Sequence, residues 1–164
     1  MEIIKPEARF FDDYLSACQE SVNHNITEWM PVQPDRFESW KENAEGIFEA
    51  LESGIGLPEG YPRTITRWCV EGDHFLGEIQ IRPDLTEESA KSYGHIGYAV
   101  RYSRWGGGLG TAILKCAVEM LRECGVRPIY IACHADNLGS NRVAQKNGFS
   151  ILETREQENL YILW

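Results

Sequence analysis

Four glycines lie almost together in the stretch RYSRWGGGLGTAILKCAV, residues 101–118. An amphipathic run follows, in which Leu109, Ile113, Ala117 and Leu121 recur every four residues, as on one face of a helix. The first N–H groups of a helix have no partner within it and carry a partial positive charge. Glycines at this point let an anion approach the backbone without meeting a Cβ. The spacing therefore predicts a phosphate site, with a pyrophosphate as the natural ligand.

Two common phosphate-binding motifs fit this run poorly. The P-loop requires a lysine directly after its last glycine, and none stands there. The dinucleotide fingerprint G-x-G-x-x-G is matched at Gly106 and Gly108, but Thr111 occupies the position of its third glycine. These mismatches argue against a nucleotide- or flavin-binding oxidoreductase.

Composition limits the class of protein. A chain of 164 residues with 43% apolar and 25% charged residues fits one globular domain, which we expect to span residues 1–164. The net charge of −9 argues against nucleic acid as a partner, because such binding depends on neutralising phosphates. No apolar run is long enough to cross a membrane, and the N-terminal acids are unlike a signal peptide, so we expect a cytoplasmic protein. The five cysteines form no C-x-x-C pair, so no metal site is predicted.

The elements that position the glycine run follow from apolar periodicity and turn residues. Their order predicts a mixed α/β (α+β) fold with one central sheet, and the crossover from 94 to 133 predicts a parallel strand pair. In the strand 74–82, Phe75, Gly77, Ile79 and Ile81 are expected on one face. The other face is expected to carry Glu78, Gln80 and Arg82. We expect strands at 2–5, 63–70, 74–82, 94–101, 129–133, 149–154 and 159–164, helices at 7–22, 34–53, 109–124 and 138–147, and a polar loop at 84–93.

Residues 94–149 resemble the GNAT superfamily of acetyl-CoA-dependent N-acyltransferases. Its main signature, [Q/R]-x-x-G-x-[G/A], is matched in its last three positions by Gly108-Leu109-Gly110. Trp105 holds the Gln/Arg position, and Arg104 lies one residue before it. The second signature, an asparagine followed by a small residue and a Gly-Phe pair, is matched by Asn137, Ser140, Gly148 and Phe149.

The resemblance implies a mostly antiparallel sheet with a splayed parallel pair, helices on both faces, and a site for acetyl-CoA. The pantetheine arm would lie along the strand edge and contact Asn137, the pyrophosphate would bind the N–H groups of the glycine run, and the Val100 N–H would stabilise the oxyanion. Arg101 and Arg104 would surround the anion. The cofactor-binding residues implied are Tyr98, Ala99, Val100, Arg101, Arg104, Trp105, Gly106, Gly107, Gly108, Leu109, Gly110, Thr111, Asn137 and Ser140.

A base must deprotonate the acceptor, because an ammonium cannot attack. His95, Glu78 and His134 are the three candidates within reach in the implied topology. Each has an alternative as a structural or solvent-facing residue. Many family members place a tyrosine in the second motif as the general acid, but Ala144 holds that position here. The candidate acids are Tyr98, Tyr102 and Tyr161.

The main hypothesis is an acetyl-CoA-dependent N-acetyltransferase acting by direct attack on a small-molecule amine or a peptide N-terminus. The alternative is a non-catalytic acyl-CoA-binding or sensing domain. The acceptor pocket is expected from residues 23–34 and 54–62, with Trp29, Met30 and Tyr61. The apolar end NLYILW could add a strand to a partner's sheet in a homodimer.

Overall fold

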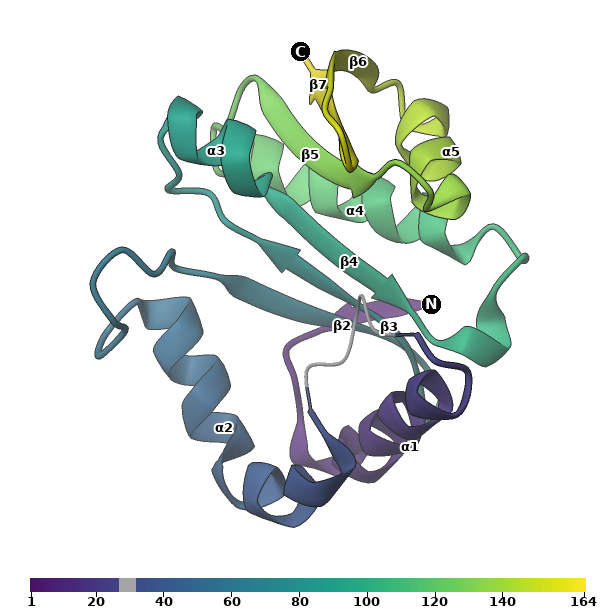
Figure 1. Ribbon diagram of the computed structural model, residues 1–164. Coiled ribbons are helices and arrows are strands. Elements are labelled where there is room, and N and C mark those ends of the chain that lie inside the picture. The colour runs from purple at the N-terminus through teal and green to yellow at the C-terminus, as the bar shows by residue number, and fades with distance from the viewer. Residues whose placement is uncertain (27–31) are drawn as a thin grey trace.

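The computed structural model describes residues 1–26 and 32–164, and the positions of Trp29 and Met30 lie outside the described residues. Two sheets, which splay apart between β4 and β5, are flanked by helices (Figure 1). The strands are β1 (Glu2–Ile4), β2 (Ile65–Glu71), β3 (His74–Ile81), β4 (Ile96–Val100), β5 (Ile129–His134), β6 (Ser150–Thr154) and β7 (Glu158–Leu163). The helices are α1 (Phe11–Asn23), α2 (Phe37–Ser53), α3 (Glu87–Tyr93), α4 (Leu109–Glu123) and α5 (Leu138–Lys146), with 3₁₀ turns at Ala8–Phe10, Pro34–Arg36 and Tyr102–Arg104.

The strands form two sheets rather than the single sheet predicted. One has the order β1-β2-β3-β4 and the other β5-β7-β6, and every pair within them is antiparallel. β4 and β5 run side by side in a similar direction and meet only where they begin (Figure 1). The α/β fold with mainly antiparallel strands and a splayed pair is thus confirmed, and the splay divides the sheet in two.

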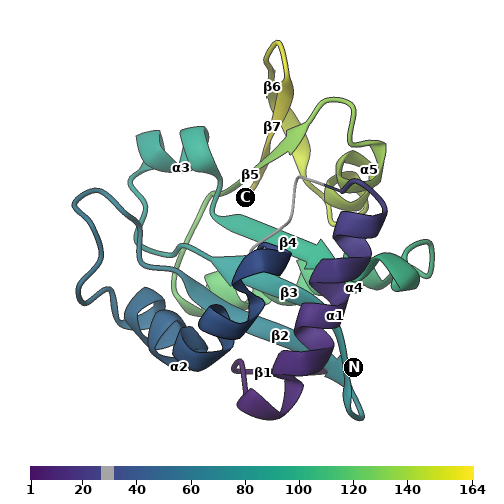
Figure 2. The same ribbon diagram turned by 60° about the horizontal axis from the view of Figure 1, so that its bottom comes forward.

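Helices cover both faces of the larger sheet, α1 and α2 on one side and α4 on the other (Figure 2). The α4 side buries aliphatic residues such as Ile79, Ile113 and Leu121. The other side is aromatic and centres on Trp68, which is fully buried and stacks on Tyr14 at a centroid distance of 4.5 Å. Burial of such rings is the main source of the packing energy between this face and the helices.

Phe75 lies on the opposite face from Ile79 and Ile81, so its predicted position was wrong. The register shifts between Cys69 and Val70, which pair with Gly77 and Phe75 respectively. This bulge inserts one residue into β3 and reverses the alternation of side chains before it. Phe75 therefore joins the aromatic face.

The polar stretch 84–93 was predicted to be a loop, but its second part forms helix α3. Thr86 caps the helix, because its Oγ1 accepts a hydrogen bond from Ser89 N (3.2 Å). Only Ala90 is buried within α3, packed near Tyr130 of β5.

The C-terminal strand β7 is the central strand of its sheet, paired with β5 on one side and β6 on the other. It therefore offers no free edge to a partner, and the edge strands of this sheet are β5, which lies beside β4, and β6. Among the described residues, no helix is long and apolar enough to cross a membrane.

Candidate functional site

A groove opens where β4 and β5 separate. His95 N donates to Tyr130 O (2.8 Å), and Tyr130 N donates to His95 Nδ1 (3.0 Å), which joins the two sheets at the start of both strands. Beyond this junction the strands diverge and enclose a cavity of ≈ 510 Å³, lined by both strands and by the N-terminal parts of α4 and α5. Twelve of the fourteen predicted cofactor-binding residues line it, and Arg101 and Gly107 do not.

The hydrogen-bond register of β4 leaves part of its backbone facing the groove. At the two ends of the β3–β4 pair, Arg82 N donates to His95 O and Arg101 N donates to Leu76 O, both at 2.9 Å. Peptide groups alternate in direction along a strand. Alternate residues between these ends therefore bond to β3, and the remaining ones, which include Val100, direct their N–H and C=O groups towards β5. This edge can pair with an extended, amide-containing ligand.

The glycine run forms a turn with exposed backbone amides at the start of α4. Gly106 and Gly108 have φ values of +83° and +81°, a left-handed conformation that side chains disfavour. Gly108 O accepts from Thr111 N (3.1 Å) and Ala112 N (3.3 Å). Within the described part of the chain, the N–H groups of residues 106–110 have no acceptor. Together with the helix dipole, they give one end of the groove the donors and the partial positive charge that an anion site requires; this end of the groove is called the anion site below.

Positive side chains surround this anion site. Arg104, Arg142 and Lys146 line the groove, and no Asp or Glu is among the described residues that line it. None of the three forms an ion pair with a described carboxylate, although acids outnumber bases in the chain. Sequence reasoning missed Arg142 and Lys146. Their i, i+4 spacing on α5, after Asn137, was the available signal.

Trp105 lies at the rim of the groove. Its side chain is 56% exposed, and its Nε1 donates to Val100 O (2.8 Å) at the end of β4. Arg101 lies outside the cavity and binds α1, with Nε on Glu20 Oε1 (2.7 Å) and Nη1 on Asp13 Oδ2 (2.8 Å). Two carboxylates thus already neutralise Arg101, and its contact with a phosphate stays a prediction.

Hydroxyl groups line the floor of the groove. Tyr98 Oη donates to Ser140 Oγ (3.3 Å), and burial raises the pKa of Tyr98 to about 12, so the phenol is protonated at neutral pH. Asn137 Oδ1 accepts from Ser140 N (3.0 Å) and caps α5 as the sequence predicts. Ala144, one turn further along α5, is fully buried in the core.

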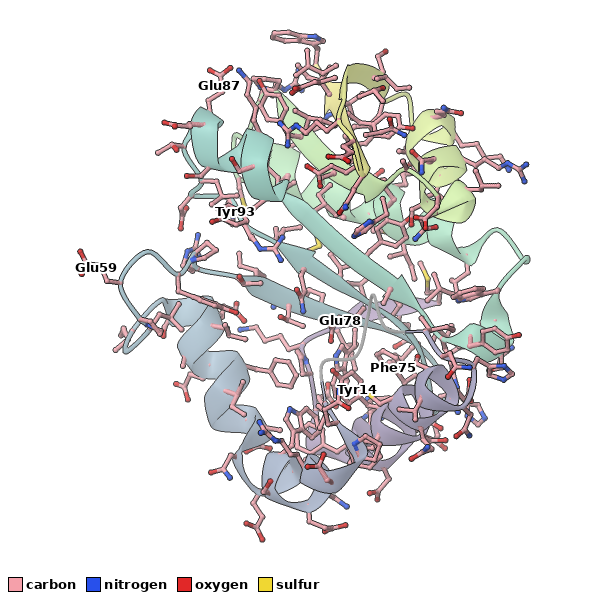
Figure 3. The ribbon with its side chains drawn as sticks, viewed as in Figure 1. Tyr14, Glu59, Phe75, Glu78, Glu87 and Tyr93 are labelled. Carbon is pink, nitrogen blue, oxygen red and sulfur yellow. The ribbon has the colours of Figure 1, made fainter. Side chains whose placement is uncertain are left out.

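Glu78 is a buried carboxylate on the aromatic face of the sheet, not on a solvated one. Glu78 is 1% exposed. Its Oε2 accepts a hydrogen bond from Trp68 Nε1 (2.9 Å), and its Oε1 accepts one from Gln80 Nε2 (2.8 Å). Figure 3 shows Glu78 beside Tyr14 and Phe75, between the sheet and α1. Burial and the charge of Glu78 hold the pKa of Tyr14 well above its usual value.

The two histidines differ in accessibility. His95 is buried, its Nδ1 already accepts the Tyr130 N–H, and burial lowers its pKa. Its neutral tautomer therefore carries the proton on Nε2, which leaves no free basic nitrogen. His134 is exposed and lines the groove at the end of β5.

Among the described residues, no group of three or more His, Cys, Asp or Glu is placed to hold a metal ion. The arrangement instead combines a strand edge with free amides, an anion site at a helix start and a polar floor. This is the arrangement of a site that binds an extended, amide-rich phosphate ester.

The comparisons with known proteins agree with this geometry. Residues 5–150 match the model of the acetyltransferase (GNAT) domain. The chain therefore belongs to the GNAT acetyltransferase domain family.

One curated relative is the protein named GCN5-related N-acetyltransferase 6, chloroplastic, of Arabidopsis thaliana. It is 33% identical over 98 residues, which cover 57% of this chain and 34% of that protein, so the alignment spans about a third of the relative's length.

Two solved structures show the same fold. One is the ribosomal L7/L12 alpha-N-protein acetyltransferase RimL, with a TM-score of 0.71, 17% identity and coverage of 99% of this chain and 93% of that one. The other is the ribosomal-protein-S5-alanine acetyltransferase from Vibrio fischeri, with a TM-score of 0.71, 15% identity and coverage of 98% and 91%. A further structure of the first enzyme is a complex with coenzyme A.

Proposed function

We propose that this chain transfers the acetyl group of acetyl-CoA to a primary amine by direct attack of the amine on the thioester. The observation that carries the proposal is the cavity between β4 and β5, which ends at the free amides before α4. Its shape and donor set fit coenzyme A, and the family membership supports the same donor.

Acetyl-CoA supplies an activated acetyl group as a thioester, and the chain's own groups bind and orient it. The amides of residues 106–110 bind the pyrophosphate, helped by Arg104 and by the dipole of α4. The exposed edge of β4 binds the pantetheine amides, and Asn137 faces the same groove. The N–H of Val100 stabilises the developing oxyanion.

We take Glu78 as the first candidate for the base; it is buried next to the groove rather than among the residues that line it. It pairs across the strands with Ala99, a neighbour of Val100, so it lies one strand away from the edge where the thioester is expected. A carboxylate buried among aromatic rings can accept a proton from an ammonium directly or through a water molecule. His134, which lines the groove, is the second candidate, and His95 is better explained as the junction between the sheets.

The departing thiolate needs a proton donor, and Ala144 cannot supply one. The hydroxyls of Tyr98 and Ser140 lie in the groove and are bonded to each other, so they can pass a proton to the sulfur. Their presence supports catalysis over a purely acyl-CoA-binding role.

A turnover assay tests the proposal. Purified protein with acetyl-CoA and a library of small amines and peptides should release free coenzyme A and yield the N-acetylated amine by mass spectrometry. Acetyl-CoA that binds without release of coenzyme A from any amine would support the sensing alternative instead.

The role of Glu78 has its own test. Glu78→Gln keeps an acceptor for Trp68 but removes the base, so kcat/KM for the amine should fall by about 10²–10⁴ with little change in acetyl-CoA affinity. Glu119→Gln, on the exposed face of α4, is the matched control and should keep full activity. Activity of Glu78→Gln within a few-fold of wild type would exclude Glu78 as the base.

A further inference from the structure

Arg82 continues a row of polar side chains along one face of β3. Glu78 and Gln80 pair across the strands with Ala99 and Gly97, which are both small. The β4 side of this face is therefore nearly free of side chains. The Arg82 guanidinium lies next to Gly97, where a Cβ would be 3.7 Å from its Nη2. Gly97 and Ala99 line the groove, whereas Glu78, Gln80 and Arg82 do not, so the polar row lies one strand away from the groove.

Arg82 is a half-buried cation without an anionic partner among the described residues. Its hydrogen bonds, to Gly94 O and to Gln80 Oε1, are both 3.5 Å long, at the limit of the interaction. The neighbouring acid in sequence, Asp84, is bonded instead to Arg63. Glu59 and Glu87 point outwards from the periphery of the molecule (Figure 3).

An unpaired guanidinium removed from water is costly, because it loses hydration without gaining a counter-charge. Burial accordingly lowers the pKa of Arg82. A bound carboxylate would supply the missing counter-charge and accept two parallel hydrogen bonds from this fork. The same face carries the candidate base, so the anion and the attacking amine would belong to one molecule.

We propose that the acceptor is an amine that also carries a carboxylate, and that Arg82 binds this carboxylate while the amine faces Glu78. This inference rests on the proposed acetyltransferase function and specifies its acceptor. The Gln80 amide bridges Glu78 and Arg82 with one hydrogen bond to each. The carboxylate and the guanidinium are therefore separated by roughly the length of an amide group and two hydrogen bonds. The ammonium and carboxylate of an α-amino acid are at least as far apart as the nitrogen and oxygen of that amide, so α-amino acids, ω-amino acids and short peptides are all long enough to reach both groups.

Matched pairs of acceptors test the proposal. Glycine, 4-aminobutyrate and 6-aminohexanoate are each compared with their methyl esters by kcat/KM for coenzyme A release. Wild type should prefer at least one of these acids over its ester by at least about tenfold, because a charge-assisted bidentate bond is lost in the ester. Equal kcat/KM for acid and ester at every length would overturn the proposal.

Variants assign the preference to Arg82. Arg82→Met keeps the aliphatic stem and removes an unpaired charge, so it should fold, bind acetyl-CoA as wild type does, and lose the preference through a raised KM for the acid. Arg82→Lys should keep part of the preference. Arg127→Met, at an exposed position on the loop before β5, is the control and should behave as wild type. An undiminished preference in Arg82→Met would also overturn the proposal.

A binding measurement separates this inference from the proposed function. With coenzyme A present, 6-aminohexanoate should raise the unfolding temperature of wild type but not of Arg82→Met. Its methyl ester should raise the unfolding temperature of wild type by less than the acid does. If no amine is ever acetylated, the proposed function fails, and this measurement alone decides the anion site. An equal rise in unfolding temperature in wild type and Arg82→Met, or no rise in wild type, would refute carboxylate binding by Arg82.

Discussion

A single charge at Thr111 should separate the stability of α4 from its capacity to bind phosphate. Thr111 lies in the first turn of α4 and lines the groove. An acidic residue in a first helical turn is favourable, because it interacts with the positive end of the helix dipole. Thr111→Asp should therefore raise the free energy of unfolding by about 0.3–1 kcal/mol. The φ values above +80° at Gly106 and Gly108 make those positions unsuitable, since any side chain there would strain the backbone.

The same carboxylate should weaken acetyl-CoA binding. Two like charges 4 Å apart repel by about 1 kcal/mol in water and about 4 kcal/mol at the effective dielectric of a protein surface. The affinity should fall by roughly 10- to 1000-fold. The asparagine of Thr111→Asn has nearly the same shape as aspartate but no charge. This variant should therefore bind acetyl-CoA with an affinity within a few-fold of wild type.

Isothermal titration calorimetry with acetyl-CoA at low and high salt measures the effect, and urea unfolding measures the stability. The defect of Thr111→Asp should shrink at high salt, because screening weakens repulsion between exposed charges. Equal affinities for the Asp and Asn variants would refute an anion site at the start of α4. A loss of both stability and affinity in the Asp variant would assign the defect to misfolding instead.

Two further predictions concern the junction and spacing of the strands. His95→Phe should lower the free energy of unfolding by about 1–3 kcal/mol in urea titrations, because it leaves the buried N–H of Tyr130 without an acceptor. Burial lowers the pKa of His95, so its contribution should be complete above the unfolded value of about 6.5 and decline as the pH falls below it. A pH dependence of unfolding that is identical in His95→Phe and wild type would contradict this. Gly77→Ala should destabilise by about 1–3 kcal/mol, because its Cβ would lie 2.7 Å from Ile113 Cδ1 and even closer to Ala99 O. A change below 0.5 kcal/mol in the same urea assay would argue against so close a packing.

The regular elements were predictable wherever apolar spacing is strong. Helix α4 and strand β5 followed directly from their apolar residues. Helix α3 did not, because only Ala90 of its seven residues is buried and a short polar helix has no apolar period. The bulge that turns Phe75 to the aromatic face depends on pairing with a distant strand, so local alternation could not reveal it.

The anion site was predictable because glycine density and a helix start are local signals. The surroundings of Glu78 were not, because alternation along β3 identifies a polar face but not the aromatic side chains that cover it. The lack of an anionic partner for Arg82 among the described residues was equally hidden. Asp84 stands two residues away in the sequence, and only the fold shows that Arg63 binds it.

A crystal structure of the complex with coenzyme A tests the central claim most directly. The account predicts the pyrophosphate within hydrogen-bond distance of the amides of residues 106–110 and the pantetheine amides paired with the free edge of β4. A coenzyme bound elsewhere, with the start of α4 empty, would contradict it.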